Sequence, residues 1–95
     1  MSDSASARVT VANRLGMHAR PAMAFVDAAS AHACKVTVQR VEPPGGDPVD
    51  GKSIMQVMML AATKGAVLEI VAEGEDAEGA LAQLVRLIES GFGEE

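Results

Sequence analysis

Two side chains that could handle a phosphoryl group stand close together in this chain, His18 and Arg20. A neutral imidazole is a good nucleophile, and its unperturbed pKa of about 6.5 leaves most of it neutral near pH 7. A guanidinium presents a fork of N–H donors that fits the oxygens of a phosphate. Phosphoryl transfer needs mainly positioning and charge stabilisation. The pair could therefore accept and release a phosphoryl group if the fold holds both residues at one place.

The segments on either side of this pair predict that His18 lies at a helix start. Residues 8–13 alternate polar and apolar side chains, which predicts a strand. Residues 19–31 are alanine-rich, and Pro21 is tolerated only in the first turn of a helix. Backbone amides and the positive end of the helix dipole gather at such a start, which makes it a ready phosphate site. On spacing alone, however, a histidine at a helix start is more often an ordinary structural residue. The apolar stripe of the predicted helix consists of Ala22, Phe25, Val26 and Ala29.

Alternation and turn residues predict the remaining elements. Ser53 followed by Gln56 fits a capping box, and this predicts a short helix that ends near residue 61. The prolines and glycines of residues 42–48 predict a loop, which we expect to have no effect on His18 because it is distant along the chain. The expected order is β-α-β-β-α-β-α in one domain over residues 8–92, after a disordered N-terminal tail over residues 1–7. The other strands are expected at residues 34–40, 49–50 and 68–72, and a last helix from Asp76 to a stop at Gly91.

Composition and charge exclude several classes of function. The chain has 2 Phe and no Trp or Tyr, so it lacks the aromatic platforms on which bases stack. A formal charge of -5 also disfavours a nucleic-acid partner. The single cysteine, Cys34, cannot form an internal disulfide and fits a reducing compartment. We find no secretory signal and no apolar run of about 18–20 residues. We therefore expect a cytoplasmic protein without membrane insertion.

Two motifs resemble those of a known family. The segment NRLGMHARPA, residues 13–22, resembles the active-site signature of the HPr family, the histidine-containing phosphocarriers of the bacterial phosphotransferase system. The segment GKSIMQVMML, residues 51–60, resembles that family's second signature. The resemblance implies an α+β fold, the HPr-like β-α-β-β-α-β-α open-faced sandwich, in which three helices cover one face of a four-stranded antiparallel sheet. It also implies that His18 is phosphorylated on its δ1 (pros) nitrogen and that Arg20 assists at the phosphoryl group.

The same resemblance implies partners. Enzyme I, charged by phosphoenolpyruvate, would be the donor, and enzyme IIA domains would be the acceptors. The chain would act as a monomer and without a bound cofactor. If classified as an enzyme, it would be a transferase with a phosphohistidine intermediate rather than a stand-alone catalyst. The C-terminal residues 91–95 resemble those of the nitrogen-related NPr branch, so sugar uptake and nitrogen-related regulation both stay open.

Ser53 has two explanations that the sequence leaves open. As an N-cap it would stabilise the short helix by about 1 kcal/mol. In many HPr proteins the serine at this place is a regulatory phosphorylation site, so HPr kinase/phosphorylase is a further candidate partner. A phosphate would be tolerated at a helix N-terminus, yet it would add negative charge beside a partner surface. Gln56 stands where a glycine is common in this signature, and this weakens the inference about regulation.

The methionines near the two motifs could fill the core or form a docking surface. Methionine is adaptable, which suits a surface that meets several partners. The resemblance implies that the two motif helices face those partners. We therefore expect Met17, Met55, Gln56 and Met58 to contact partners, with Met55 and Gln56 partly exposed.

Two other classes of function compete with a phosphocarrier. A regulatory binding module with an HPr-like fold, controlled at Ser53, would act by docking alone, although the presence of both His18 and Arg20 counts against it. A stand-alone enzyme or metal protein would need further catalytic or metal-ligating side chains, which the chain lacks. His32 and Cys34 alone do not make a metal site, so no metal is expected.

Overall fold

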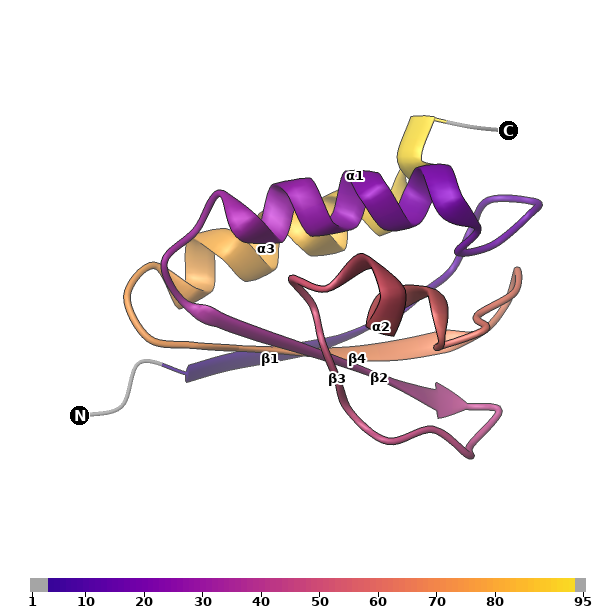
Figure 1. The fold of residues 1–95 in the computed structure, drawn as a ribbon, viewed down its shortest axis with the longest axis horizontal. Helices are drawn as coiled ribbons and strands as arrows, with labels where there is room; N and C mark the ends of the chain where they lie inside the picture. Colours follow the sequence, from indigo (N-terminus) through magenta and orange to yellow (C-terminus); the bar gives the residue numbers. More distant parts are fainter. Residues whose placement is uncertain (1–3, 94–95) are drawn as a thin grey trace.

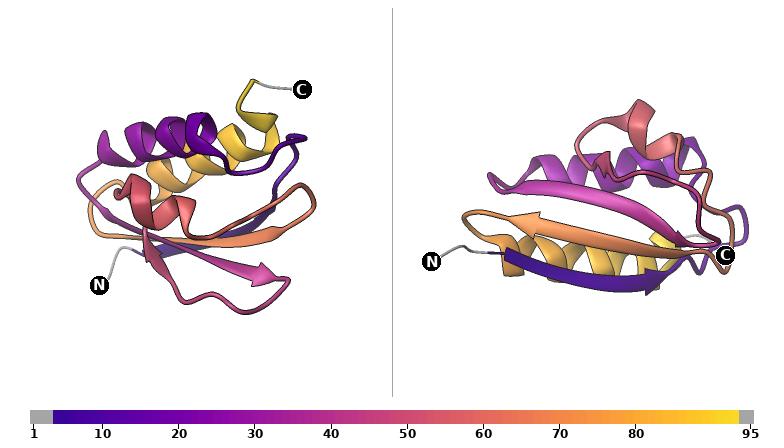
Figure 2. Two further views of the ribbon diagram at one scale, coloured as in Figure 1. Left: turned by 45° about the vertical axis from the view of Figure 1, so that its right-hand side comes forward. Right: turned by 90° about the horizontal axis from the view of Figure 1, so that it is seen from below.

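The computed structural model describes residues 4–93, and its elements follow the predicted order. Four antiparallel strands form one sheet, and the described residues contain three α-helices. Figures 1 and 2 show the helices on one face of this sheet. The predicted α+β open-faced sandwich is therefore confirmed. The strands are β1 (Ser4–Thr10), β2 (Lys35–Glu42), β3 (Val49–Asp50) and β4 (Val67–Glu73), in the sheet order β1-β4-β2-β3. The helices are α1 (Ala19–Ser30), α2 (Ile54–Met58) and α3 (Ala77–Glu89), and a 3-10 turn, η1 (Gly91–Gly93), follows them.

The core lies between the sheet and the helix layer. Helix α3 packs on β1 and β4, and α1 packs against both α2 and α3. Alternate side chains of each strand point toward the helices. Burying a large apolar side chain in such a layer stabilises the fold by about 2 kcal/mol. The largest apolar side chains buried there are Phe25, Leu68, Ile70, Leu84 and Ile88.

The first strand lies earlier in the chain than the alternation predicted. It runs over Ser4–Thr10, and residues 4–7 pair with residues 70–73 of β4, so the disordered tail expected there is wrong for these residues. Serine and alanine have little β propensity, which hides the strand in the sequence. Pairing with β4 stabilises these residues as a strand despite their low β propensity. Residues 1–3, the rest of the expected tail, lie outside the described residues.

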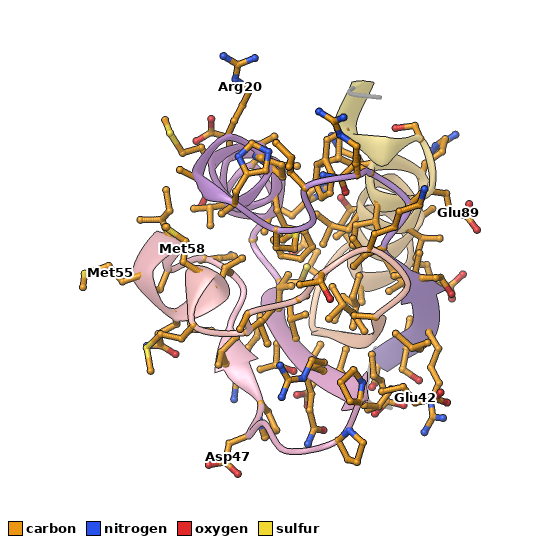
Figure 3. The ribbon with its side chains drawn as sticks, turned by 90° about the vertical axis from the view of Figure 1, so that its right-hand side faces the viewer. Arg20, Glu42, Asp47, Met55, Met58 and Glu89 are labelled. Atoms are coloured by element: carbon orange, nitrogen blue, oxygen red, sulfur yellow. The ribbon has the colours of Figure 1, made fainter. Side chains whose placement is uncertain are left out.

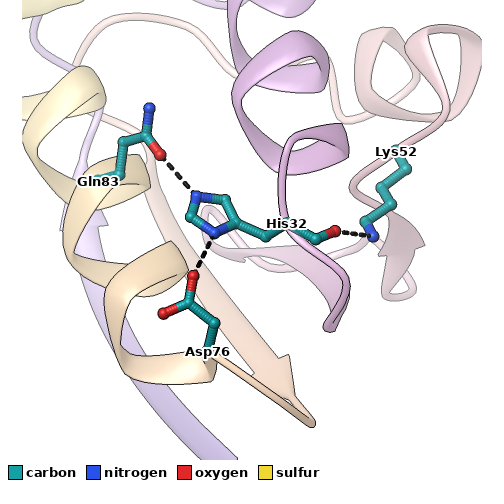
Figure 4. Close-up of polar contacts among 4 residues, drawn as sticks. All are labelled: His32, Lys52, Asp76 and Gln83. Atoms are coloured by element: carbon teal, nitrogen blue, oxygen red, sulfur yellow. Dashed lines mark hydrogen bonds and ion pairs between the residues drawn. The ribbon is translucent and has the colours of Figure 1, made fainter.

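His32, just after α1, joins three parts of the fold (Figure 4). Its Nδ1 lies 2.7 Å from Oδ2 of Asp76, at the start of α3, and its Nε2 lies 2.7 Å from Oε1 of Gln83. Lys52 Nζ donates a 2.7 Å hydrogen bond to the carbonyl oxygen of His32. The hydrogen bonds with Gln83 and then Asp76 raise the pKa of His32 above 6.5, because the doubly protonated ring can donate to both oxygens. His32 therefore fastens the end of α1 to α3 and to the segment before α2.

Candidate functional site

His18 occupies the N-cap position of α1. Its backbone is extended, with φ of -78° and ψ of -170°, and its carbonyl accepts a 3.0 Å hydrogen bond from the amide of Ala22. Helix geometry offers no acceptor within α1 to the amides of Ala19 and Arg20, and Pro21 has no amide hydrogen. The His18 side chain is half-buried. The structure thus places His18 at the helix start that the sequence predicted.

The loop before His18 rests on the segment that follows α2. The amide of Met17 donates a 2.9 Å hydrogen bond to the carbonyl of Ala62. Gly16 has φ of +69°, and a Cβ built there would lie 2.8 Å from the Cα of Thr63, so the approach of the two backbones requires glycine. Asn13, 1% exposed, donates a 2.7 Å hydrogen bond from Nδ2 to the carbonyl of Gly16. These contacts fix the backbone immediately before His18.

Arg20 belongs to the first turn of α1, two residues after His18 along the chain. Its side chain is exposed, and Figure 3 shows the guanidinium projecting away from the body of the molecule. A long side chain in this position can change its rotamer without disturbing the core. Its guanidinium is therefore accessible to a group bound at the helix start.

Ser53 caps α2, although the predicted capping box is only half formed. Its Oγ accepts a 3.3 Å hydrogen bond from the amide of Gln56. The Gln56 side chain does not return the contact to Ser53: its Oε1 accepts a 2.9 Å hydrogen bond from the amide of Asp50. The reason is the preceding turn, in which the Ser53 amide already donates to the carbonyl of Asp50 at 3.1 Å. Gln56 thus ties α2 to the end of β3.

Helix α2 presents an exposed apolar surface. Met55 is 75% exposed and Met58 is 44% exposed, and Figure 3 shows both side chains on the outside of α2. Gln56 is also exposed. Met59, at the C-cap of α2, is exposed as well. We call Met55, Met58 and Met59 the methionine face.

Comparison with known proteins decides the family. Residues 5–90 match the family model for the PTS HPr component phosphorylation site. The chain belongs to the HPr family. It is 50% identical over 86 residues to the phosphocarrier protein HPr of Pseudomonas aeruginosa, covering 90% of this chain and 92% of that one. It is 38% identical over 88 residues to the phosphocarrier protein NPr of Proteus mirabilis, covering 93% and 94%.

Solved structures agree with this assignment. The crystal structure of HPr-C-His from Thermoanaerobacter tengcongensis is 41% identical and superimposes with a TM-score of 0.87, covering 96% of this chain and 98% of that one. The two signature segments therefore identified the family and the fold correctly. As a member of the HPr family, the chain is a phosphocarrier of the phosphotransferase system.

Within the HPr fold, Met17 differs from its expected role. Its side chain is 5% exposed and belongs to the core cluster, so the expectation that it contacts partners is wrong. Its side chain packs into the core, and its backbone amide donates a hydrogen bond to the carbonyl of Ala62. Three exposed apolar side chains near the site were not among the partner contacts expected from the sequence. These are Leu15, Met23 and Met59.

Two further findings concern ligands and membranes. Within residues 4–93, no group of three or more His, Cys, Asp and Glu side chains is arranged to hold a metal ion. Cys34 is buried, and the His32 ring is engaged by Asp76 and Gln83. Every helix of the described segment falls short of the length and apolarity needed to span a bilayer.

Proposed function

We propose that the chain carries a phosphoryl group on Nδ1 (the pros nitrogen) of His18. The lone pair of Nδ1 forms the new bond to phosphorus while the bond to the donor breaks, and the electron pair of that bond leaves with the donor. Onward transfer repeats the exchange with the acceptor as the nucleophile. The ring therefore reacts in the tautomer that keeps its proton on Nε2. The position of His18 as N-cap of α1 is the observation that carries this proposal.

The helix start supplies the charge stabilisation. The amides of Ala19 and Arg20 point out of the first turn, where the helix dipole favours an anion. A phosphohistidine at the N-cap would place its oxygens near these donors. The Arg20 guanidinium, accessible in the free protein, turns toward the same oxygens and offers two N–H groups in one plane.

The donor in this proposal is phosphoenolpyruvate-charged enzyme I, and the acceptors are enzyme IIA domains. Met55, Gln56 and Met58 contact these partners, because an exposed apolar face with flexible side chains adapts to more than one protein. The protein acts in the cytoplasm as a monomer, and it needs no bound cofactor for transfer. Met59 extends the docking surface beyond the residues expected from the sequence.

Labelling with enzyme I and radioactive phosphoenolpyruvate tests the acceptor. The chain has two histidines, so His32→Ala is a matched control for His18→Ala. Acid-labile label should appear on the wild type and on His32→Ala, and it should be absent from His18→Ala. Label that persists on a folded His18→Ala would overturn the assignment of the acceptor.

The identity of the recipient needs a separate measurement. The labelled protein is mixed with a sugar-specific or a nitrogen-related enzyme IIA domain from the same organism. The resemblance of the C-terminal residues to NPr favours the nitrogen-related domain. Faster loss of label to a sugar-specific domain would instead assign the chain to sugar uptake.

A regulatory binding module controlled at Ser53 is the alternative function. Ser53 caps the same short helix that carries the methionine face, so a phosphate on its Oγ, written by HPr kinase/phosphorylase, would place negative charge beside the docking surface. A pull-down of partners that is indifferent to His18→Ala but sensitive to Ser53→Asp supports this alternative. Equal capture by Ser53→Asp and the wild type argues against it.

A further inference from the structure

A charged residue stands on the helix-covered side of β2. The register pairs Val36 with Ala72, Val38 with Ile70 and Arg40 with Leu68. Val36 and Val38 are buried beneath the helices, so the alternation of the strand puts Arg40 on the same face. A charge in that position is costly unless it is hydrogen-bonded. The partners of Arg40 therefore show what it does in the fold.

The Arg40 guanidinium joins two segments that are distant in the sequence. Its Nε donates a 2.9 Å hydrogen bond to the carbonyl of Pro43, in the loop over residues 42–48. Its Nη1 donates a 3.0 Å hydrogen bond to the carbonyl of Leu60, just after α2. Gln39, the preceding residue, donates from Nε2 to the carbonyl of Gly46 at 3.0 Å and holds the same loop.

The segment that Arg40 holds is also the support of the His18 loop. The carbonyl of Ala62 accepts the Met17 amide, and Met17 directly precedes His18. Ala61 lies between the two bonded carbonyls with φ of +50°, a conformation that an alanine rarely adopts and that its surroundings must impose. Arg40 on one side and Met17 on the other are hydrogen-bonded to the residues that flank Ala61. The turn at Ala61 thus joins the carbonyl that Arg40 binds to the carbonyl that Met17 binds.

We propose that Arg40 is a positioning residue for phosphoryl transfer, which holds the 60–62 segment so that the backbone before His18 keeps its place. The inference rests on the proposed role of His18 as acceptor. Without Arg40, the Leu60 carbonyl loses a charged donor and Ala61 can relax to a negative φ. The Ala62 carbonyl then moves away from the Met17 amide. The loop over residues 42–48, which we expected to have no effect on His18, contributes through the Pro43 carbonyl.

The test uses the full chain and four proteins: wild type, Arg40→Ala, Arg40→Lys and Arg8→Ala. Arg8 is the matched control, because it is an exposed arginine of the same sheet whose Nε lies 3.6 Å from Oε2 of Glu69. Three quantities are measured on each protein: the exchange rate of the Met17 amide, the rate of phosphorylation by enzyme I, and the rate at which isolated phosphoprotein loses its label. The last rate involves no partner, so it separates positioning of His18 from docking.

Arg40→Ala should speed exchange of the Met17 amide and slow phosphorylation, each by about threefold or more, because small displacements of a reacting group reduce rates strongly. It should also change the lifetime of the isolated phosphoprotein. Arg8→Ala should match the wild type in all three measurements. Arg40→Lys should give values between those of the wild type and Arg40→Ala. Its single ammonium keeps the charge but cannot bind both carbonyls as the guanidinium does.

The inference is overturned if a folded Arg40→Ala has the same exchange rate at the Met17 amide, or the same phosphorylation rate, as the wild type. If Arg40→Ala does not fold, Arg40→Lys decides by the same readouts, and values equal to the wild type overturn it. A wild type that takes no label on His18 is a failure of the proposed function instead. In that case the exchange rate of the Met17 amide still tests whether Arg40 positions this backbone. The role of Arg40 in phosphoryl transfer is then withdrawn.

Discussion

The amide of Met17 and the carbonyl of Ala62 form a 2.9 Å hydrogen bond that joins the two halves of the site. Met17 belongs to the segment before α1, and Ala62 belongs to the segment after α2. The loop that presents His18 is therefore bonded to the segment that follows the helix of the methionine face. A change in either segment should therefore alter the position of the other.

Gly16→Ala should damage this junction. Its Cβ would lie 2.8 Å from the Cα of Thr63, at a φ of +69° that alanine adopts at a cost. We expect a loss of about 2 kcal/mol or more in the free energy of unfolding, measured in urea. Phosphorylation by enzyme I should also slow. Gly46→Ala is the control, because its Cβ would meet nothing within 4 Å, and an equal loss in both variants would contradict this explanation.

Replacing Arg20 should affect transfer and leave stability almost unchanged. The side chain is exposed and projects from α1, so Arg20→Ala should change the free energy of unfolding by less than about 0.5 kcal/mol. Phosphorylation of His18 should slow by about tenfold, because one bidentate phosphate contact is lost. Arg20→Lys should recover part of the rate. Arg86→Ala, an exposed arginine on α3, should behave as the wild type, and equal rates in all four proteins would argue against a role for Arg20.

The contacts of His32 predict a stability that depends on pH. Because the pKa of His32 is raised in the folded protein, its contribution is fully present below the unfolded value of 6.5 and is lost as pH rises through the folded pKa. Asp76 and Gln83 face the ring and favour its charged form, while the charge of Lys52 opposes it. The difference in unfolding free energy between wild type and His32→Ala should therefore shrink as the pH rises from below 6.5 through the raised pKa of the folded state. A difference that is constant over this range would show that the contacts do not depend on the proton.

Local patterns were sufficient to predict the order of elements and the place of His18. Pro21 and the apolar stripe locate the start of α1, and Ser53 locates the start of α2, because caps and periodicity act within a few residues. The beginning of β1 could not be predicted in this way. Ser4 and Ala5 are held by pairing with Glu73 and Ala72 of β4, which are distant in the sequence.

The hydrogen bonds that hold the site in place could not be predicted from the sequence either, for the same physical reason. Arg40 continues the alternation of Val36 and Val38, so its inward position was visible in principle, but its partner carbonyls were not. The same holds for Met17, whose side chain is buried in the core and whose amide donates to the carbonyl of Ala62. Contacts that depend on register and on turns between distant segments require the three-dimensional structure.

Met17 and Met55 provide a test of which methionines form the core and which form the docking surface. Met17 is 5% exposed and Met55 is 75% exposed. Met17→Ala should lower the free energy of unfolding by about 2–4 kcal/mol, because it leaves a cavity, whereas Met55→Ala should leave stability within about 0.5 kcal/mol of the wild type. Met55→Ala should instead raise KM for phosphorylation by enzyme I with little change in kcat, since it removes contact area in the complex and not the reacting groups. Urea unfolding and initial rates at several protein concentrations measure both effects. A Met55→Ala that binds and reacts as the wild type would remove this residue from the docking surface and shift the assignment to Met58 and Met59.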